Sequence, residues 1–203
     1  MARRTKEDAL VTRALILDAA ERVFQRRGVS RTSLQEIAQE ASLTRGAIYW
    51  HFQNKGDVFN AMMERVTLPM EASFKGQSSA TLATPLQQLR TGVASAFHLT
   101  VHDPQVQRVF EIALHLVEYV DELATVRERH IVERGECTLD IENLLGLAMQ
   151  NGQLSQRIPV RTAAIGLHAL ISGLLQNWLL DPKAFDLEVV GAQTLEAYLV
   201  GLA

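Results

Sequence analysis

The chain has 203 residues, 47% of them hydrophobic, and a formal net charge of −3. This composition supports a sizeable core and excludes general disorder. The charge is uneven, because residues 1–56 carry ten Lys/Arg against six Asp/Glu, whereas the remainder carries ten against seventeen. This basic head, residues 1–56, on an acidic remainder indicates that only the head binds a polyanion.

Other features bear on the cellular compartment. The single cysteine, Cys137, rules out an intrachain disulfide, and we interpret it as a small buried apolar residue. The N-terminus lacks the apolar region of a secretory signal. The most hydrophobic run, residues 163–180, is interrupted by His168, Gln176 and Asn177, which favours a helix buried by protein over a membrane span. We therefore expect a cytoplasmic protein with no membrane partner.

No segment alternates with period two, whereas helical spacing recurs, so the sequence predicts an all-α fold of about nine helices. The first helix is expected over residues 7–27 and is followed by Gly28 in a left-handed conformation. The second helix starts at a capping box, Ser33–Glu36. A tight turn around Ser42 then leads to a third helix with Thr44 as its N-cap.

Caps and prolines mark the later helices. Asn54 is the expected N-cap of a fourth helix. After a polar loop over residues 76–85, Thr84-Pro85 and Asp103-Pro104 each place a capping side chain before a proline at the first helical position. The last three helices are expected over residues 121–151, 159–181 and 183–203.

The second and third helices, braced by the first, have the arrangement of a helix-turn-helix unit over about residues 33–52, within a domain of residues 1–56. The second helix of such a unit enters the DNA major groove with its N-terminal residues against the bases. Thr44 and Arg45 supply hydrogen-bond donors there, and arginine suits the O6/N7 edge of guanine.

The rest of the stretch TRGAIYWHFQNK suits DNA binding in other ways. Gly46 and Ala47 are small, so the backbone can approach DNA, while Tyr49 and His51 can reach phosphates. The predicted DNA-binding residues are Thr32, Ser33, Thr44, Arg45, Gly46, Ala47, Tyr49, Trp50, His51 and Lys55. The alternative is a plain three-helix core with solvated polar residues, in which Trp50 packs; Phe52 is assigned to the core in either case.

The segments RRTKEDA, TRALILDAAERVFQRRGVSRTSLQEIAQEASLTRGAIYWHFQNK and NWLLDPKAFDL closely resemble the TetR family of bacterial repressors, in its AcrR-like, multidrug efflux branch. This resemblance implies an all-helical homodimer with an N-terminal DNA-binding domain. It places DNA contacts on Thr44, Arg45, Tyr49, His51 and Lys55. Residues 57–203 would then bind a ligand and form the dimer. The resemblance weakens at residues 115–119, which read HLVEY where such proteins typically read HKCEF.

An apolar cavity among helices, with a few polar groups, is the expected form of a small-molecule site. Polar or aromatic residues on apolar helix faces are the candidates for its lining. The predicted ligand-binding residues are Val66, Phe97, Phe110, Leu114, His115, Cys137, Ile141, His168, Ile171, Ser172 and Gln176. The alternative for His168 and Gln176 is a set of satisfied polar groups in a dimer interface.

Gly166 and Gly173 are seven residues apart and share a helix face, so another helix can approach closely there. With the last helix they suit a four-helix dimer interface, although packing within one chain is an alternative. The predicted interface residues are Gly166, Gly173, Leu174, Trp178, Leu195, Tyr198 and Leu199.

His98 and His102 have a spacing that can hold zinc, but with only Asp103 nearby we interpret them as solvated residues at a helix C-terminus. No catalytic motif, metal site or cofactor is expected. The sequence therefore predicts a repressor that binds a palindromic operator as a dimer, controls an efflux pump operon and is released by hydrophobic small molecules. The alternatives are a small-molecule-binding protein or enzyme with a helix-turn-helix-like head, and an activator on the same fold.

Overall fold

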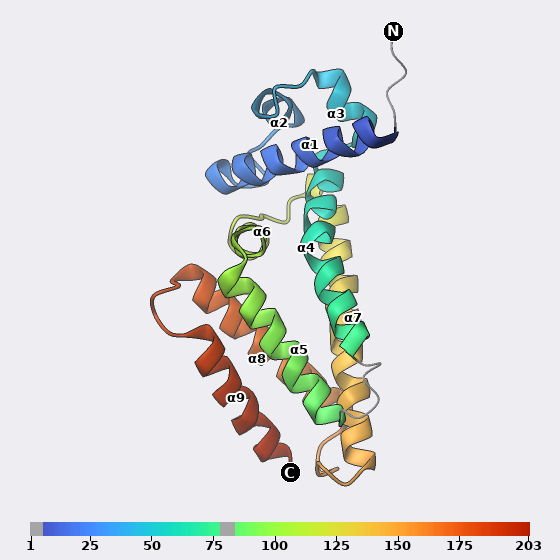
Figure 1. Cartoon of the computed structure of the whole chain (residues 1–203), viewed down its shortest axis with the longest axis vertical. Coiled ribbons are helices and arrows are strands. Elements are labelled where there is room, and N and C mark those ends of the chain that lie inside the picture. The colour runs from blue at the N-terminus through green and yellow to red at the C-terminus, as the bar shows by residue number, and fades with distance from the viewer. Residues whose placement is uncertain (1–5, 78–83) are drawn as a thin grey trace. The chain divides into compact units, whose positions relative to one another are not determined.

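The computed structural model describes residues 6–77 and 84–203, and for residues 69–77 it describes the backbone only. Within these ranges the fold is all-α, as predicted, with nine α-helices, one 3-10 turn (η1) and no strand (Figure 1). The elements are α1 Lys6–Arg27, α2 Leu34–Glu40, α3 Arg45–His51, α4 Lys55–Gln77, α5 Pro85–His102, α6 Pro104–His115, η1 Asp121–Leu123, α7 Ala124–Gln150, α8 Val160–Leu180 and α9 Leu187–Leu202.

The chain forms two compact units. Unit 1 combines the N-terminal residues up to Val66 with Arg108–Arg129, and unit 2 combines Thr67–Gln107 with His130–Ala203. The helices α4, α6 and α7 contribute residues to both units. The functional division at residue 56 stays a prediction, since the compact units divide the chain at other places.

Local capping sets most helix starts where the sequence predicts them. The Ser33 hydroxyl accepts from the Glu36 N–H at 3.3 Å, and the Glu36 carboxylate accepts from the Ser33 N–H at 2.9 Å, which completes the capping box. Asn54 Oδ1 accepts from the Asp57 N–H at 2.9 Å. Gly28 has a φ of +79°, as its place after α1 requires.

Three boundaries differ from the prediction. The fourth helix, α4, continues to Gln77, so the predicted loop lies largely at residues 78–83, outside the described residues. The α7 helix begins at Ala124 rather than Asp121, because a 3-10 turn precedes it. The α9 helix begins at Leu187, because Asp186 Oδ1 accepts from the Val189 N–H at 3.0 Å and caps it there.

In unit 1, α2 is held against α1 by both apolar and ionic contacts. Ile16 of α1 and Ile37 of α2 are fully buried. Glu40, at the end of α2, accepts from Arg22 Nε at 2.8 Å and from Arg26 at 2.6 Å. These contacts fix the first helix as a brace for the two helices that follow.

The residues of the second chain segment complete unit 1. The Val29 N–H donates to the Leu116 carbonyl at 2.9 Å, and Ser30 Oγ donates to Glu118 at 3.2 Å. Leu123 is fully buried. The loop between α1 and α2 is therefore supported by residues from the end of α6 and the turn after it.

In unit 2, α9 packs against α5 and α8, and Figure 1 shows α5 and α9 side by side. The Phe97 ring of α5 occupies the space that Gly191 of α9 leaves, since a Cβ there would lie 2.3 Å from the ring. Tyr198 of α9 donates its hydroxyl to the Ala163 carbonyl of α8 at 2.8 Å. One glycine and one tyrosine thus set the spacing of three helices.

The α8 helix is the apolar run singled out in the sequence. It has 21 residues and its most apolar window has a mean hydropathy of 1.4, so the helix is long and apolar enough to cross a membrane by length and composition alone. Only 28% of the residues in its most apolar window are buried within this chain. This share is low for the predicted helix that is buried by protein. Most of the other apolar residues of α8 are half-buried, and Ile165 and Leu180 are exposed.

Candidate nucleic-acid interface

The start of α3 has the form that the sequence predicts. Thr44 is in an extended conformation and its hydroxyl oxygen accepts from the Ala47 N–H at 3.2 Å, which caps the helix. Ser42, with a φ of 56°, makes the turn from α2. Thr44, Arg45 and Gly46 are all exposed. The leading end of this short helix is therefore open to a large partner.

The two faces of α3 separate cleanly. Ile48 is fully buried and Phe52 is 5% exposed, with the guanidinium of Arg13 5.4 Å from the centre of the Phe52 ring. The assignment of Phe52 to the core is confirmed. Trp50, by contrast, is 68% exposed, so it does not pack in the core. The opposite face therefore presents polar and aromatic groups to the outside.

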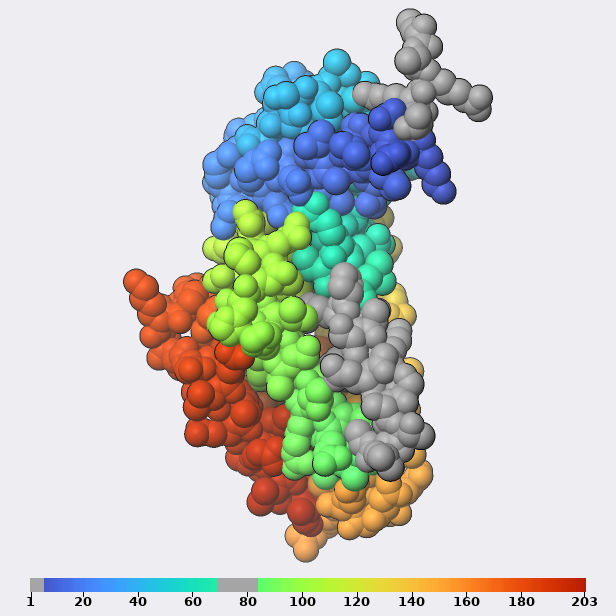
Figure 2. Space-filling model, viewed as in Figure 1, coloured from blue at the N-terminus to red at the C-terminus, as the bar shows by residue number. Residues whose placement is uncertain are grey.

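Arg45 and Tyr49 form a pair on this outer face. The guanidinium of Arg45 lies 5.3 Å from the centre of the Tyr49 ring, in a cation–π contact. Tyr49 is 47% exposed. In the space-filling view, α2 and α3, in light blue, form an uncovered part of the surface of unit 1 (Figure 2).

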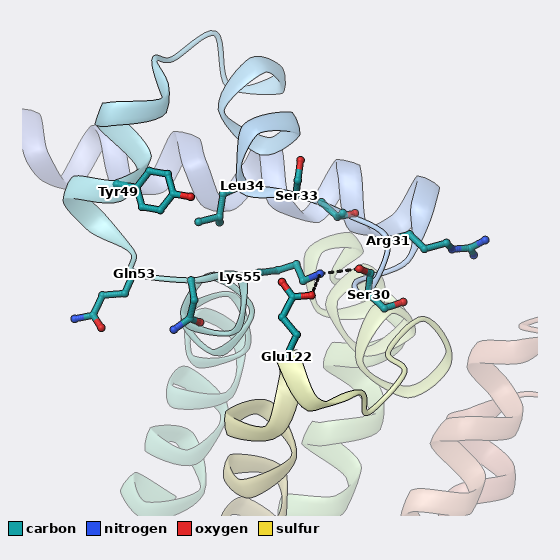
Figure 3. Close-up of a pocket in the computed structure, with 10 residues that line it drawn as sticks. Ser30, Arg31, Ser33, Leu34, Tyr49, Gln53, Lys55 and Glu122 are labelled. Carbon is teal, nitrogen blue, oxygen red and sulfur yellow. Dashed lines mark hydrogen bonds and ion pairs between the residues drawn. The ribbon is translucent and has the colours of Figure 1, made fainter.

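An open cleft of about 490 Å³ lies beside this surface, between the start of α2, the end of α3 and the start of α4. Figure 3 shows the Tyr49 hydroxyl directed toward Leu34 and Ser33 on one side of the cleft, and Arg31 near its end. Hydroxyl and guanidinium groups of this kind are common contacts for DNA phosphates. Arg31 is a candidate that sequence reasoning missed, although it directly precedes Thr32.

The structure overturns two of the expected contacts. Thr32 is 3% exposed and its hydroxyl donates to the Gly28 carbonyl at 2.8 Å, so it supports the loop instead of offering a donor. Lys55 is 4% exposed; its Nζ donates to the Ser30 carbonyl at 2.7 Å and to Glu122 at 3.1 Å (Figure 3). The charge of Lys55 is thus satisfied inside the protein.

Electrostatics separates the arginines of unit 1 into two groups. Hydrogen bonds from Arg26 and Arg22 lower the pKa of Glu40 to about 2, so this carboxylate stays ionised and partly neutralises both arginines. Among the described residues, Arg31 and Arg45 have no ion-pair partner. Arg31 and Arg45 therefore leave unneutralised positive charge on the side of α3 and the cleft.

The predicted ligand-binding residues are divided between the two units. In unit 1, Val66 is buried, while Phe110, Leu114 and His115 are half-buried. In unit 2, Ile141, His168, Ile171 and Ser172 are half-buried, and Gln176 is exposed.

The surroundings of three predicted pocket residues, Phe97, Cys137 and His168, differ from one another. Phe97 is 1% exposed and fills the notch at Gly191, so it acts as a packing residue. Cys137 is exposed, which contradicts the expected burial. Burial, aided by Arg134 and His130, lowers the pKa of His168, which lies 3.5 Å from the Ser172 hydroxyl.

Some of the predicted dimer residues are buried within the chain, whereas others remain accessible to a partner. Trp178, Leu195 and Leu199 are buried within the chain. A Cβ at Gly166 would lie 2.5 Å from the Tyr198 hydroxyl, so the close approach there is made within one chain, as the alternative held. At Gly173 a Cβ would meet nothing within 4 Å, which leaves that position accessible.

Comparison with known protein families gives two matches that together cover most of the chain. Residues 16–62 match the family of bacterial regulatory proteins called tetR, and residues 84–202 match the C-terminal region of MAATS-type transcriptional repressors.

Individual relatives match over nearly the full length. The HTH-type transcriptional regulator TtgR of Pseudomonas putida is 37% identical over 92% of this chain and 89% of its own. AcrR of Shigella flexneri, an HTH-type transcriptional regulator, is 38% identical over 98% and 95%.

Solved structures agree with these matches. NalD, the secondary repressor of the MexAB-OprM multidrug efflux pump in Pseudomonas aeruginosa, has a TM-score of 0.87 and 37% identity over 98% of both chains. SmeT in complex with triclosan has a TM-score of 0.82 and 33% identity over 94% and 91%.

Proposed function

Because the chain belongs to the TetR family of bacterial regulatory proteins, we propose that it is a transcriptional repressor that binds operator DNA and controls a multidrug efflux operon. One observation carries the proposal. The α3 helix buries Ile48 and Phe52 while Arg45, Gly46 and Tyr49 face outward beside a cleft lined by hydroxyl groups.

In this proposal α3 lies in the major groove with its N-terminal end against the bases. Gly46 carries no side chain, so the backbone of α3 can come close to the base edges. Arg45 reads guanine through its O6/N7 edge. Tyr49, Ser33 and Arg31 contact phosphates, which fix the position of the helix on the duplex.

The repressor acts as a homodimer. Two recognition helices placed about 34–36 Å apart require a palindromic or nearly palindromic operator. Support for the interface comes from α8 and α9, where Ile165, Leu180 and Val200 are 53%, 72% and 72% exposed and Gly173 is accessible. Apolar side chains grouped on two helices favour burial by a second copy.

Release from DNA is proposed to follow the binding of a hydrophobic small molecule. The relative SmeT has been solved with triclosan, which supports this class of ligand. The helices α4, α6 and α7 are continuous through residues of both units, so a displacement of one of them can reach unit 1. Coupling is reciprocal, so the inducer must bind the DNA-loaded protein less tightly by the same factor.

The direct test is a footprint on the DNA that flanks the gene, followed by anisotropy titrations of the protected sequence. We expect protection of a palindromic site and a loss of affinity of about 10³-fold or more between 50 and 200 mM salt. A transcription assay on the same promoter separates repression from activation. Absence of sequence-specific binding, with tight ligand binding or turnover instead, would overturn the proposal.

A further inference from the structure

The helices α5 and α9 of unit 2 lie side by side (Figure 1). Side chains hold them together at three points along this contact. Arg90 of α5 forms a bidentate ion pair with Glu196 of α9: its Nε donates to one carboxylate oxygen, and its Nη2 donates to the other at 2.8 Å. Phe97 fills the space at Gly191 in the middle. At the third point, His98 and His102 of α5 meet Glu188 of α9.

The three side chains at this third point converge on one place. His98 Nδ1 lies 2.9 Å from one Glu188 oxygen, and His102 Nε2 lies 2.9 Å from the other. The two ring centres are 4.3 Å apart. One ligand atom from each side chain lies within 4.8 Å of the other two.

The position of these groups is set by rigid structure. His98 directly follows the buried Phe97, and His102 is one turn further along the same helix. Glu188 lies in the first turn of α9, which the Asp186 cap fixes. The backbone of both helices therefore holds the three ligands on one side of the α5–α9 contact, as a preformed site requires.

We propose that His98, His102 and Glu188 form a binding site for a divalent transition-metal ion of the Zn²⁺ class, which links α5 to α9. Two imidazoles and one carboxylate suit such ions, whereas Mg²⁺ and Ca²⁺ prefer an all-oxygen shell. Three protein ligands leave a further position for water. The sequence could not reveal the site, because Glu188 is far from the histidines along the chain.

Binding needs only small side-chain movements. Ligand atoms that share one tetrahedral zinc ion lie about 3.4 Å apart, given metal–ligand distances near 2.1 Å, so the widest separations among the three side chains, which reach up to 4.8 Å, must shorten. The side chains are 60%, 54% and 40% exposed, so they can rotate. A neutral imidazole has two tautomers. In one of them the ring nitrogen that now faces Glu188 carries a lone pair, which can bind an ion.

The test is calorimetric titration of the full-length protein with Zn²⁺ in the absence of DNA, together with the visible spectrum of Co²⁺. We expect one ion per chain, a rise in the unfolding temperature with Zn²⁺ but not with Mg²⁺, and a Co²⁺ spectrum typical of nitrogen and oxygen ligands. His102→Ala and Glu188→Gln should each weaken Zn²⁺ binding by at least about tenfold.

Cys137→Ser is the matched control, because a thiolate is the strongest competing zinc ligand in the chain. This variant should bind Zn²⁺ as the parent does. The proposal is overturned if the parent shows no saturable binding, if His102→Ala binds Zn²⁺ unchanged, or if Cys137→Ser removes the bound ion. A binding-defective His102→Ala that keeps its metal-free unfolding temperature excludes misfolding as the cause.

Discussion

The guanidinium of Arg45 lies 5.3 Å from the centre of the Tyr49 ring, on the outer face of α3. The contact restrains a long side chain at the helix end that is proposed to enter the major groove. A restrained arginine loses less conformational freedom when it binds a guanine edge. The side chain proposed to contact a base, Arg45, therefore packs on the side chain proposed to contact a phosphate, Tyr49.

Replacement of this arginine tests the base contact. Arg45→Ala should weaken operator binding by about 10- to 100-fold, the cost of one good bidentate base contact. The melting temperature should not change, because Arg45 is exposed. Fluorescence anisotropy with the operator gives the affinity. Arg157→Ala, an equal charge change at an exposed position in unit 2, should bind as the parent does; an equal loss there would indicate a general charge effect.

Gly46 offers a change with opposite effects on fold and function. A Cβ at Gly46 would meet only the Thr44 hydroxyl, at 4.0 Å, so Gly46→Ala fits the protein. It should keep or raise stability by up to about 1 kcal/mol, since alanine favours a helix. It should nevertheless weaken DNA binding, because the backbone there is proposed to approach the bases.

Gly135→Ala is the control for Gly46→Ala. Gly135 lies within α7, and a Cβ there would meet nothing within 4 Å. Urea unfolding should show a similar stabilisation of both variants, while anisotropy should show a loss of DNA affinity only for Gly46→Ala. Unchanged affinity in Gly46→Ala would contradict a close backbone approach at this position.

The notch at Gly191 should tolerate no side chain. In Gly191→Ala the new methyl group would lie 2.3 Å from the Phe97 ring, and Phe97 is too deeply buried to move freely. Overpacking of this kind costs about 1–3 kcal/mol. Chemical denaturation should therefore show a clear loss for Gly191→Ala and little change for Gly201→Ala on the same helix, where a Cβ meets nothing within 4 Å.

Acid should weaken the attachment of α2 to α1 through Glu40. The pKa of Glu40 is lowered to about 2 by Arg26 and Arg22, below its value in an unfolded chain, so the ionised form stabilises the fold at neutral pH. This contribution is lost as the pH falls from about 4.5 through about 2. Urea midpoints at falling pH should drop less in Glu40→Gln than in the parent. Glu136→Gln, at an exposed position, should follow the parent.

Gly173 distinguishes the dimer from the folded protomer. A side chain at Gly173 meets open space in one chain, so Gly173→Glu should fold normally. If α8 lies in the dimer interface, the bulky charge should shift the protein toward monomer in sedimentation velocity. Gly135→Glu on α7 should stay dimeric, and a dimeric Gly173→Glu would place the interface elsewhere.

The features that the sequence predicted correctly are those that neighbouring residues determine. The capping box at Ser33, the Thr44 cap and the inward position of Ile48 and Phe52 follow from spacing within one or two turns. The family, confirmed by the comparisons, followed from that region together with the segments RRTKEDA and NWLLDPKAFDL.

The features that the sequence missed depend on contacts between distant segments. Lys55 is sequestered by Glu122, and Gly166 faces Tyr198 of its own chain. The spacing of His98 and His102, with only Asp103 nearby, predicts solvated residues, whereas in the structure both contact Glu188 of another helix. Periodicity shows which face of a helix is apolar, but it does not show which residue lies opposite.

The composition of unit 1 limits how freely its DNA-reading part can be exchanged between proteins. A chain cut after Val66 would lose the Leu116 carbonyl that receives the Val29 N–H, and Glu122, the carboxylate beside Lys55. A chimaeric regulator made from the N-terminal helices alone would thus leave a buried ammonium group without its counter-ion. A viable hybrid would have to include Arg108–Arg129 as well. An exchange of DNA-binding specificity between proteins therefore requires both chain segments of unit 1.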